Sequence, residues 1–82
     1  MAIVHLQADH RRFTGGEEVL EVDGATVGAV IAELERRFPG LGPLLTEGAS
    51  VAIDGELLPR GSIYEEVGPT TDVHFIAPIT GG

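Results

Sequence analysis

The chain has 82 residues, the size of one small domain, and 43% of them are hydrophobic, a fraction typical of a folded globule. Its net charge is −8, with five arginines and no lysine, which argues against nucleic-acid binding because phosphates attract a basic surface. The chain has no cysteine, which excludes disulfides, thiolate metal sites and a cysteine nucleophile. Since no stretch is typical of a signal peptide or a membrane span, we expect a cytoplasmic protein without membrane contact.

The first quarter of the sequence predicts a β-hairpin. Residues 3–8 are mostly apolar or β-branched and predict a strand, which ends at the polar run 9–12. Residues 14–17, Thr-Gly-Gly-Glu, are a turn signal, and residues 18–22 predict a second short strand. A glycine-containing loop between two strands is typical of a hairpin.

Residues 26–38 predict the main helix. Its apolar residues recur at helical spacing and fall on one stripe, formed by Val27, Val30, Ile31, Leu34 and Phe38. The N-cap candidates are Thr26 and, as the less favoured one, Ala25; Thr26 is preferred because a threonine hydroxyl can accept a hydrogen bond from a free N–H of the first turn. Pro39 and Gly40 end the helix. A helix with one apolar stripe must cover an apolar surface.

The second half of the sequence predicts that surface. Leu41, Leu44 and Leu45 predict one tucked turn, and residues 51–53 predict a strand. Asp54 and Gly55 form a dipeptide typical of tight hairpin turns, after which residues 56–58 return. Residues 72–77 predict the last strand, with Val73 and Phe75 facing the core. One helix on one face of a sheet makes an α+β roll, in which we expect the first and last strands to lie side by side at the centre.

Residues 77–82, Ala-Pro-Ile-Thr-Gly-Gly, follow the last strand and end in two glycines. Glycine has no Cβ, so such an end fits a channel too narrow for side chains, and its free carboxylate can enter the active site of another protein. Glycine is also common at the ends of chains, so the tail is informative only on a rigid platform. We therefore expect a folded domain over residues 1–76 and a flexible tail over residues 77–82.

Four segments in this order resemble the MoaD/ThiS group of ubiquitin-like sulfur carriers. They are residues 25–28 (Ala-Thr-Val-Gly), which open the helix, residues 38–41 (Phe-Pro-Gly-Leu), which close it, residues 51–55 (Val-Ala-Ile-Asp-Gly), and residues 72–82 with the terminal Gly-Gly. The resemblance covers the whole chain. It implies a β-grasp fold, a mixed sheet of four to five strands with one main helix packed on one face.

The resemblance also implies a reaction. An E1-like adenylyltransferase of the MoeB/ThiF type would use ATP to adenylate Gly82, next to Gly81. A sulfur donor protein would then give a thiocarboxylate, whose sulfur passes to a sulfur-accepting synthase subunit or enzyme. The protein would be a carrier and not an enzyme by itself, without a bound cofactor. The recipient pathway stays open between molybdopterin, thiamin, cysteine or other sulfur metabolites and tRNA thiolation.

Partner binding is expected around the tail. Parity along the last strand turns Ile76 outward, beside the tail, with Leu58 as a weaker companion. The partner-binding set is therefore Ile76, Pro78, Ile79, Thr80 and Leu58. The three histidines lack metal-ligand spacing and predict surface or cross-strand positions. Two alternatives remain, a ubiquitin-like modifier joined through Gly82 to lysines of other proteins, and an interaction module in which the Gly-Gly is incidental.

Overall fold

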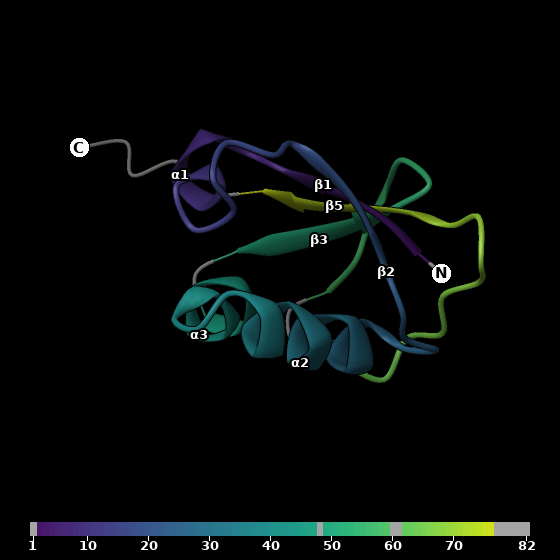
Figure 1. The fold of residues 1–82 in the computed structure, drawn as a ribbon. Coiled ribbons are helices and arrows are strands. Elements are labelled where there is room, and N and C mark those ends of the chain that lie inside the picture. Colours follow the sequence, from purple (N-terminus) through teal and green to yellow (C-terminus); the bar gives the residue numbers. More distant parts are fainter. Residues whose placement is uncertain (1, 48, 60–61, 77–82) are drawn as a thin grey trace.

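The computed structural model describes residues 2–47, 49–59 and 62–76, with the side chains of all of these except residues 8, 9 and 47. Five strands form one mixed sheet in the order β2-β1-β5-β3-β4. Their bounds are β1 Ala2–Leu6, β2 Val19–Val22, β3 Ser50–Ile53, β4 Glu56–Leu57 and β5 Asp72–Ile76. The helices are α1 Ala8–Arg11, α2 Val27–Arg37 and α3 Leu41–Glu47. Helices α2 and α3 lie together on one side of the sheet (Figure 1).

The first and last strands are neighbours at the centre of the sheet, as predicted. β1 and β5 pair in parallel, with Val4 opposite Val73 and Leu6 opposite Phe75. The outer pairs, β1 with β2, β5 with β3 and β3 with β4, are all antiparallel. Because β5 has a partner on both sides, its backbone is held along its whole length.

Helix α2 follows from its sequence pattern. The Thr26 hydroxyl accepts a hydrogen bond from the Ala29 amide at 3.1 Å, which confirms the predicted N-cap. The predicted stripe faces the sheet, and its buried members are Val27, Val30, Ile31 and Leu34. The helix ends at Arg37, one residue before Phe38, and Gly40 then turns the chain with φ of 101°. This stripe and the inward-facing strand residues close one apolar core.

Helix α3 is longer than the single turn predicted for residues 41–45. It continues to Glu47, and Leu41 and Leu45 are fully buried. Pro43 is compatible with the helix because it stands in the first turn, where its missing N–H breaks no helical hydrogen bond. The Glu35 carboxylate accepts hydrogen bonds from the backbone N–H groups of Gly40 and Gly42, at 3.0 and 2.7 Å. A side chain from α2 therefore caps the start of α3.

Two further boundaries differ from the sequence prediction. The first strand ends at Leu6, and the polar run that was expected to be a loop contains the one-turn helix α1. The strand predicted for residues 56–58 is only Glu56–Leu57, so Leu58 lies outside it. The tight turn between β3 and β4 is confirmed, with positive φ at both Asp54 (49°) and Gly55 (85°).

Candidate functional site

The candidate site begins where β5 ends. Ile76 is the last described residue, and it pairs with Ser50 at the start of β3. Because β1 and β5 run in parallel, their C-terminal ends lie at the same end of the sheet. Helix α1, which follows β1, lies beside the end of β5 (Figure 1). We call this end of the sheet the tail end of the molecule. Any chain that continues from Ile76 therefore starts from a central strand that has partners on both sides.

Most of the predicted site residues lie beyond that point. Gly81, Gly82, Pro78, Ile79 and Thr80 fall outside the described residues, so their roles stay predictions. Ile76 is half-buried and lies on the face of the sheet opposite to Phe75, which is fully buried under the helices. The outward orientation predicted for Ile76 is therefore what the structure shows.

Leu58 does not lie on the same face as Ile76, which corrects the expectation that the two residues share a surface. Its amide donates to the Val51 carbonyl, and its side chain packs against the core. It lines a small hollow of about 170 Å³ between the helices and β3, with Ile31, Leu45 and Val51 among the other lining residues. The pairing register turns Leu57 outward instead, because Leu57 lies opposite Ala52, while Leu58 comes level with Val51 on the helix side.

The face of the sheet away from α2 and α3 carries a row of side chains that sequence reasoning missed. The pairing register puts one residue of every strand into this row, which runs Val19, His5, His74, Ala52, Leu57. At the usual strand spacing the row spans roughly 19 Å. Its two ends, Val19 and Leu57, are large apolar residues that are 54% and 64% exposed. We call this set the open-face row.

Two histidines occupy the middle of the open-face row. The rings of His5 and His74 are stacked, with centroids 4.1 Å apart and planes inclined by 6°. His5 Nε2 lies 2.9 Å from an oxygen of Asp72, and the Asp72 amide donates to the Asp54 carboxylate at 3.0 Å. The prediction of cross-strand histidines is confirmed for this pair. The third histidine, His10, is instead buried in α1.

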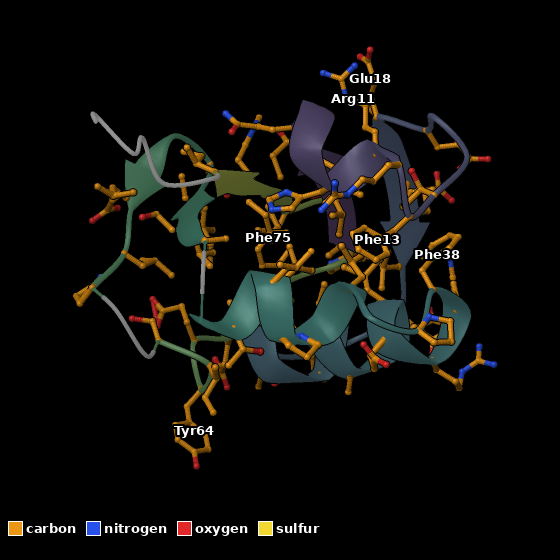
Figure 2. All side chains as sticks on the ribbon, turned by 90° about the vertical axis from the view of Figure 1, so that its left-hand side faces the viewer. Arg11, Phe13, Glu18, Phe38, Tyr64 and Phe75 are labelled. Atoms are coloured by element: carbon orange, nitrogen blue, oxygen red, sulfur yellow. The ribbon has the colours of Figure 1, made fainter. Side chains whose placement is uncertain are left out.

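A basic residue and an aromatic ring mark the tail end. Arg11 forms an ion pair with Glu18 at 2.9 Å, and these two side chains lie together at the outer side of α1 (Figure 2). The guanidinium carbon of Arg12 lies 5.3 Å from the centre of the Phe13 ring, within the range of a cation–π contact. Phe13 itself lies between α1 and the layer of helices below it, near Phe38 in this view (Figure 2).

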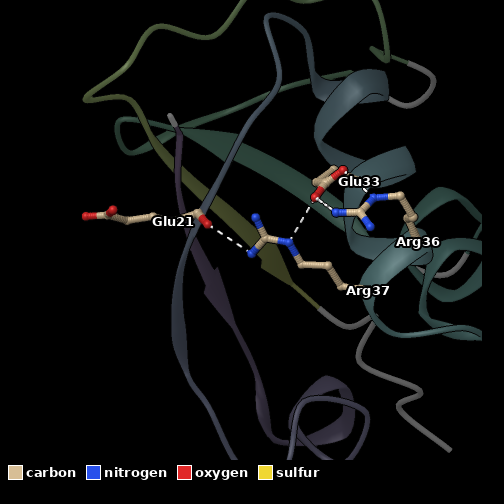
Figure 3. A network of polar contacts seen from close by, with 4 residues as sticks. All are labelled: Glu21, Glu33, Arg36 and Arg37. Carbon is tan, nitrogen blue, oxygen red and sulfur yellow. Dashed lines mark hydrogen bonds and ion pairs between the residues drawn. The ribbon is translucent and has the colours of Figure 1, made fainter.

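The other two described arginines belong to a separate network at the end of α2 (Figure 3). The Glu33 carboxylate accepts hydrogen bonds from Arg36 and Arg37, and Arg37 also donates to the Glu21 carbonyl of β2 at 3.2 Å. Hydrogen bonds from Arg36 and then from Arg37 lower the pKa of Glu33 to about 2. The same bond raises the pKa of Arg36. These contacts connect α2 to the edge strand β2, so we assign them a structural role.

The described residues show no cluster that suits a metal. No group of three or more histidine, cysteine, aspartate or glutamate side chains in this part of the chain is arranged to hold an ion. None of the helices in the described ranges is long and apolar enough to cross a membrane. The features left to describe a site are the central strand that leads into the tail, the arginine on an aromatic ring at the tail end, and the open-face row across the sheet.

Comparison with known proteins identifies the group to which this architecture belongs. The model of the ThiS family matches residues 4–82, nearly the entire chain. The chain belongs to the ThiS family. No curated protein sequence matches it significantly. Family membership agrees with the resemblance found in the sequence and makes the protein a small ubiquitin-like carrier, not an enzyme by itself.

Three solved structures share the fold of this ThiS-family protein. A chain of the crystal structure of the Amycolatopsis orientalis BexX/CysO complex is 26% identical, with a TM-score of 0.89 and 100% of both chains covered. Mycobacterium tuberculosis CysO is 20% identical, with a TM-score of 0.86 over 96% of this chain and 100% of that one. The small archaeal modifier protein SAMP1 of Methanosarcina acetivorans is 18% identical, with a TM-score of 0.84 over 99% and 95%. These likenesses confirm the predicted β-grasp fold.

Proposed function

We propose that this ThiS-family protein is a sulfur carrier whose reactive group is the carboxylate of Gly82. The observation that carries the proposal is the extent of the family match, which runs to Gly82 and so includes the terminal Gly-Gly. The fold supports it, because β5 is paired on both sides and gives the tail a rigid root. A carrier needs this combination of a fixed platform and a narrow reactive end.

The proposed chemistry has two steps. An E1-like adenylyltransferase of the MoeB/ThiF type catalyses attack of a Gly82 carboxylate oxygen on the α-phosphorus of ATP, which releases pyrophosphate. Hydrosulfide released by a donor protein then attacks the carbonyl carbon, AMP leaves, and Gly82 becomes a thiocarboxylate. A carboxylate alone is a poor acyl donor, so adenylylation supplies the leaving group. The thiocarboxylate passes its sulfur to an enzyme that synthesises a cofactor or metabolite. The candidate products are molybdopterin, thiamin, cysteine or a similar compound.

The tail and its surroundings take separate roles in this proposal. Gly81 and Gly82 leave the carbonyl open to attack. Pro78 restricts the backbone at the root, which lowers the entropy lost when the tail enters a channel. Ile79 and Thr80 form the spacer, the part of the tail that lies inside that channel. Ile76 and the open-face row form the docking surface, in which Leu57 replaces the Leu58 of the sequence prediction.

The absence of cysteine makes the test specific. The protein is incubated with the adenylyltransferase of its source genome, ATP and a sulfide donor, and is then treated with iodoacetamide. A thiocarboxylate is alkylated, whereas the unmodified chain has no thiol to react. We expect one alkyl group at Gly82 by tandem mass spectrometry, and none in a matched chain that ends at Thr80. Pyrophosphate exchange without alkylation would support adenylylation but contradict the sulfur-carrier assignment.

The alternative is a protein modifier joined through Gly82 to lysines of other proteins. The likeness that favours it is the fold of SAMP1, a small archaeal modifier protein. Both functions begin with the same adenylate, so they differ only in the nucleophile that attacks it. Gly-Gly remnants on lysines of cellular proteins, combined with no alkylation by iodoacetamide, would replace the sulfur-carrier function with this one.

A further inference from the structure

The arginines of this acidic chain are used unequally. The net charge is −8, and the structure describes four of the five arginines, Arg11, Arg12, Arg36 and Arg37. Arg11 pairs with Glu18, while Arg36 and Arg37 share Glu33. Within the described ranges, Arg12 is the arginine whose side chain makes no ion pair or hydrogen bond. Among the described side chains none neutralises its charge, although acidic residues outnumber basic ones by 13 to 5 in the sequence.

Arg12 is nevertheless held in place. Its guanidinium lies over the ring of Phe13, which is half-buried and packs against the core. The ring is also close to the backbone of the turn between α2 and α3, since a Cβ added at Gly40 would lie 3.2 Å from Phe13 Cε1. A cation on a fixed aromatic ring loses less conformational freedom when it forms a new ion pair than a side chain that is free in solvent. Arg12 is thus exposed, charged and already positioned.

The fold puts this cation at the same end of the sheet as the root of the tail. Arg12 follows α1, and α1 follows β1, which ends level with β5 because the two strands are parallel. Six residues follow Ile76, so an extended tail reaches about 20 Å from the sheet. When the tail is inserted into a partner, Arg12 therefore lies on the end of the molecule that approaches the mouth of the channel, whereas Gly82 lies at its bottom with the nucleotide.

We propose that Arg12 is an electrostatic docking contact for a carboxylate on the protein that receives the tail, placed beside the mouth of its channel. This inference rests on the proposed function, which requires such a partner. A cation without an ion-pair partner on an acidic protein favours one orientation of a complex, because the partner's carboxylate is attracted to it and repelled by the acidic residues elsewhere. Arg12 is a positioning residue, since it lies far from the reacting atoms.

Binding without chemistry tests the proposal. The affinity of the adenylyltransferase of the source genome is measured by calorimetry in the absence of nucleotide, for the wild-type protein and for Arg12→Gln, Arg12→Lys and Thr70→Glu. Thr70→Glu is the matched control. Like Arg12→Gln, this variant makes the net charge more negative by one. Thr70, however, lies in the exposed turn before β5, at the end of the sheet opposite to the tail end. Thermal melts establish that all variants are folded.

We expect Arg12→Gln to weaken binding roughly fivefold at low salt, as for the loss of one interfacial charge pair. Arg12→Lys keeps a cation that can also lie over the Phe13 ring and stays within about twofold of wild type. Thr70→Glu, away from the tail end, also stays within about twofold. Raising the ionic strength to about 1 M, where the Debye length is roughly 3 Å, brings Arg12→Gln and wild type together. Equal affinities of Arg12→Gln and wild type at low salt would overturn the proposal.

Two further outcomes would also overturn it. An equal loss in Thr70→Glu would mean that net charge and not position matters. An effect of Arg12→Gln that appears only when ATP is present would mean that Arg12 meets the phosphates of the nucleotide and not a carboxylate of the protein. A failure of the proposed function is recognised separately, since the wild-type protein would then form no thiocarboxylate whatever Arg12 does in binding.

Discussion

The two faces of the central sheet use the same strands for different purposes. On the helix side, Val73 and Phe75 of β5 are fully buried under α2 and α3. On the other side, His74 and Ile76 of the same strand are only half-buried. The open-face row, to which His74 belongs, ranges from the buried Ala52 to the exposed Leu57. The helix side is thus a closed apolar layer that supplies stability. The open side keeps apolar and ionisable groups at the surface, where a partner can use them.

The largest expected effect separates two adjacent residues of β5. Phe75→Ala removes a fully buried ring and is expected to lower the free energy of unfolding by about 3–5 kcal/mol, from lost burial and the cavity left behind. Ile76→Ala removes a half-buried side chain from the other face and is expected to cost less than about 1 kcal/mol. Urea unfolding followed by circular dichroism measures both.

If Phe75→Ala does not fold, Phe75→Leu replaces it in the comparison with Ile76→Ala, because leucine keeps most of the apolar volume. An Ile76→Ala variant that loses as much stability as Phe75→Ala would contradict the division between the two faces. Ile76 would then belong to the core, and its assignment to the docking surface would fail.

The second prediction concerns the exposed ends of the open-face row. Val19→Ser combined with Leu57→Ser is expected to leave the melting temperature almost unchanged, because both side chains are more than half exposed. The same change is expected to weaken binding to the adenylyltransferase roughly tenfold, which is about 1.4 kcal/mol. Affinity is measured without nucleotide, by calorimetry.

Tyr64→Ser is the control for this pair. Tyr64 is 85% exposed, but it lies in the loop before β5 and points away from the sheet (Figure 2). A loss of affinity in Tyr64→Ser equal to that of the double variant would show that docking is not specific to the open face.

The helix side could be predicted from the sequence, because its signals are local. The apolar residues of α2 recur at helical spacing, and Thr26 caps the start of the helix. Asp54 and Gly55 are likewise typical of the tight turn that they form. Alternation along the last strand separated Phe75 from Ile76 for the same reason. Each of these signals needs only residues that are close in sequence.

The alignment of side chains into the open-face row could not be predicted, because it depends on register between strands. His5 and His74 lie at opposite ends of the chain, and only the pairing of β1 with β5 brings their rings together. A shift of one residue between β3 and β4 decides whether Leu57 or Leu58 faces outward. The single turn of α1 has no periodicity to detect, and α3 owes its cap to Glu35 on the preceding helix. Tertiary contacts supply this information.

A smaller effect tests the local signals on the helix side. Thr26→Ala removes the side-chain oxygen that accepts from the Ala29 amide and is expected to cost about 1 kcal/mol of stability. Thr26→Ser keeps an acceptor in place and is expected to retain most of it. If both variants lose the same amount in urea unfolding, the threonine methyl group and not the cap would be responsible.

The smallest effect concerns the ion pairs that connect α2 to the edge of the sheet. The pKa of Glu33 is lowered from 4.5 to about 2 by its bonds to Arg36 and Arg37. A lowered pKa in the folded state stabilises the fold above pH 4.5, and this contribution is lost as the pH falls from 4.5 towards 2. Glu33→Gln is therefore expected to melt below wild type at neutral pH, with a difference that shrinks over this range.

Melting temperatures of wild type, Glu33→Gln and Glu17→Gln at several pH values between 7 and 2 measure that difference. Glu17 is exposed in the loop before β2, so Glu17→Gln makes the same change of charge without removing this network. Because Glu33 is close to solvent and its arginines are exposed, screening by salt keeps the effect small. A constant gap between Glu33→Gln and wild type down to pH 2 would mean that glutamine disturbs packing. The ion pairs of Glu33 would then contribute nothing measurable to the stability of the helix side.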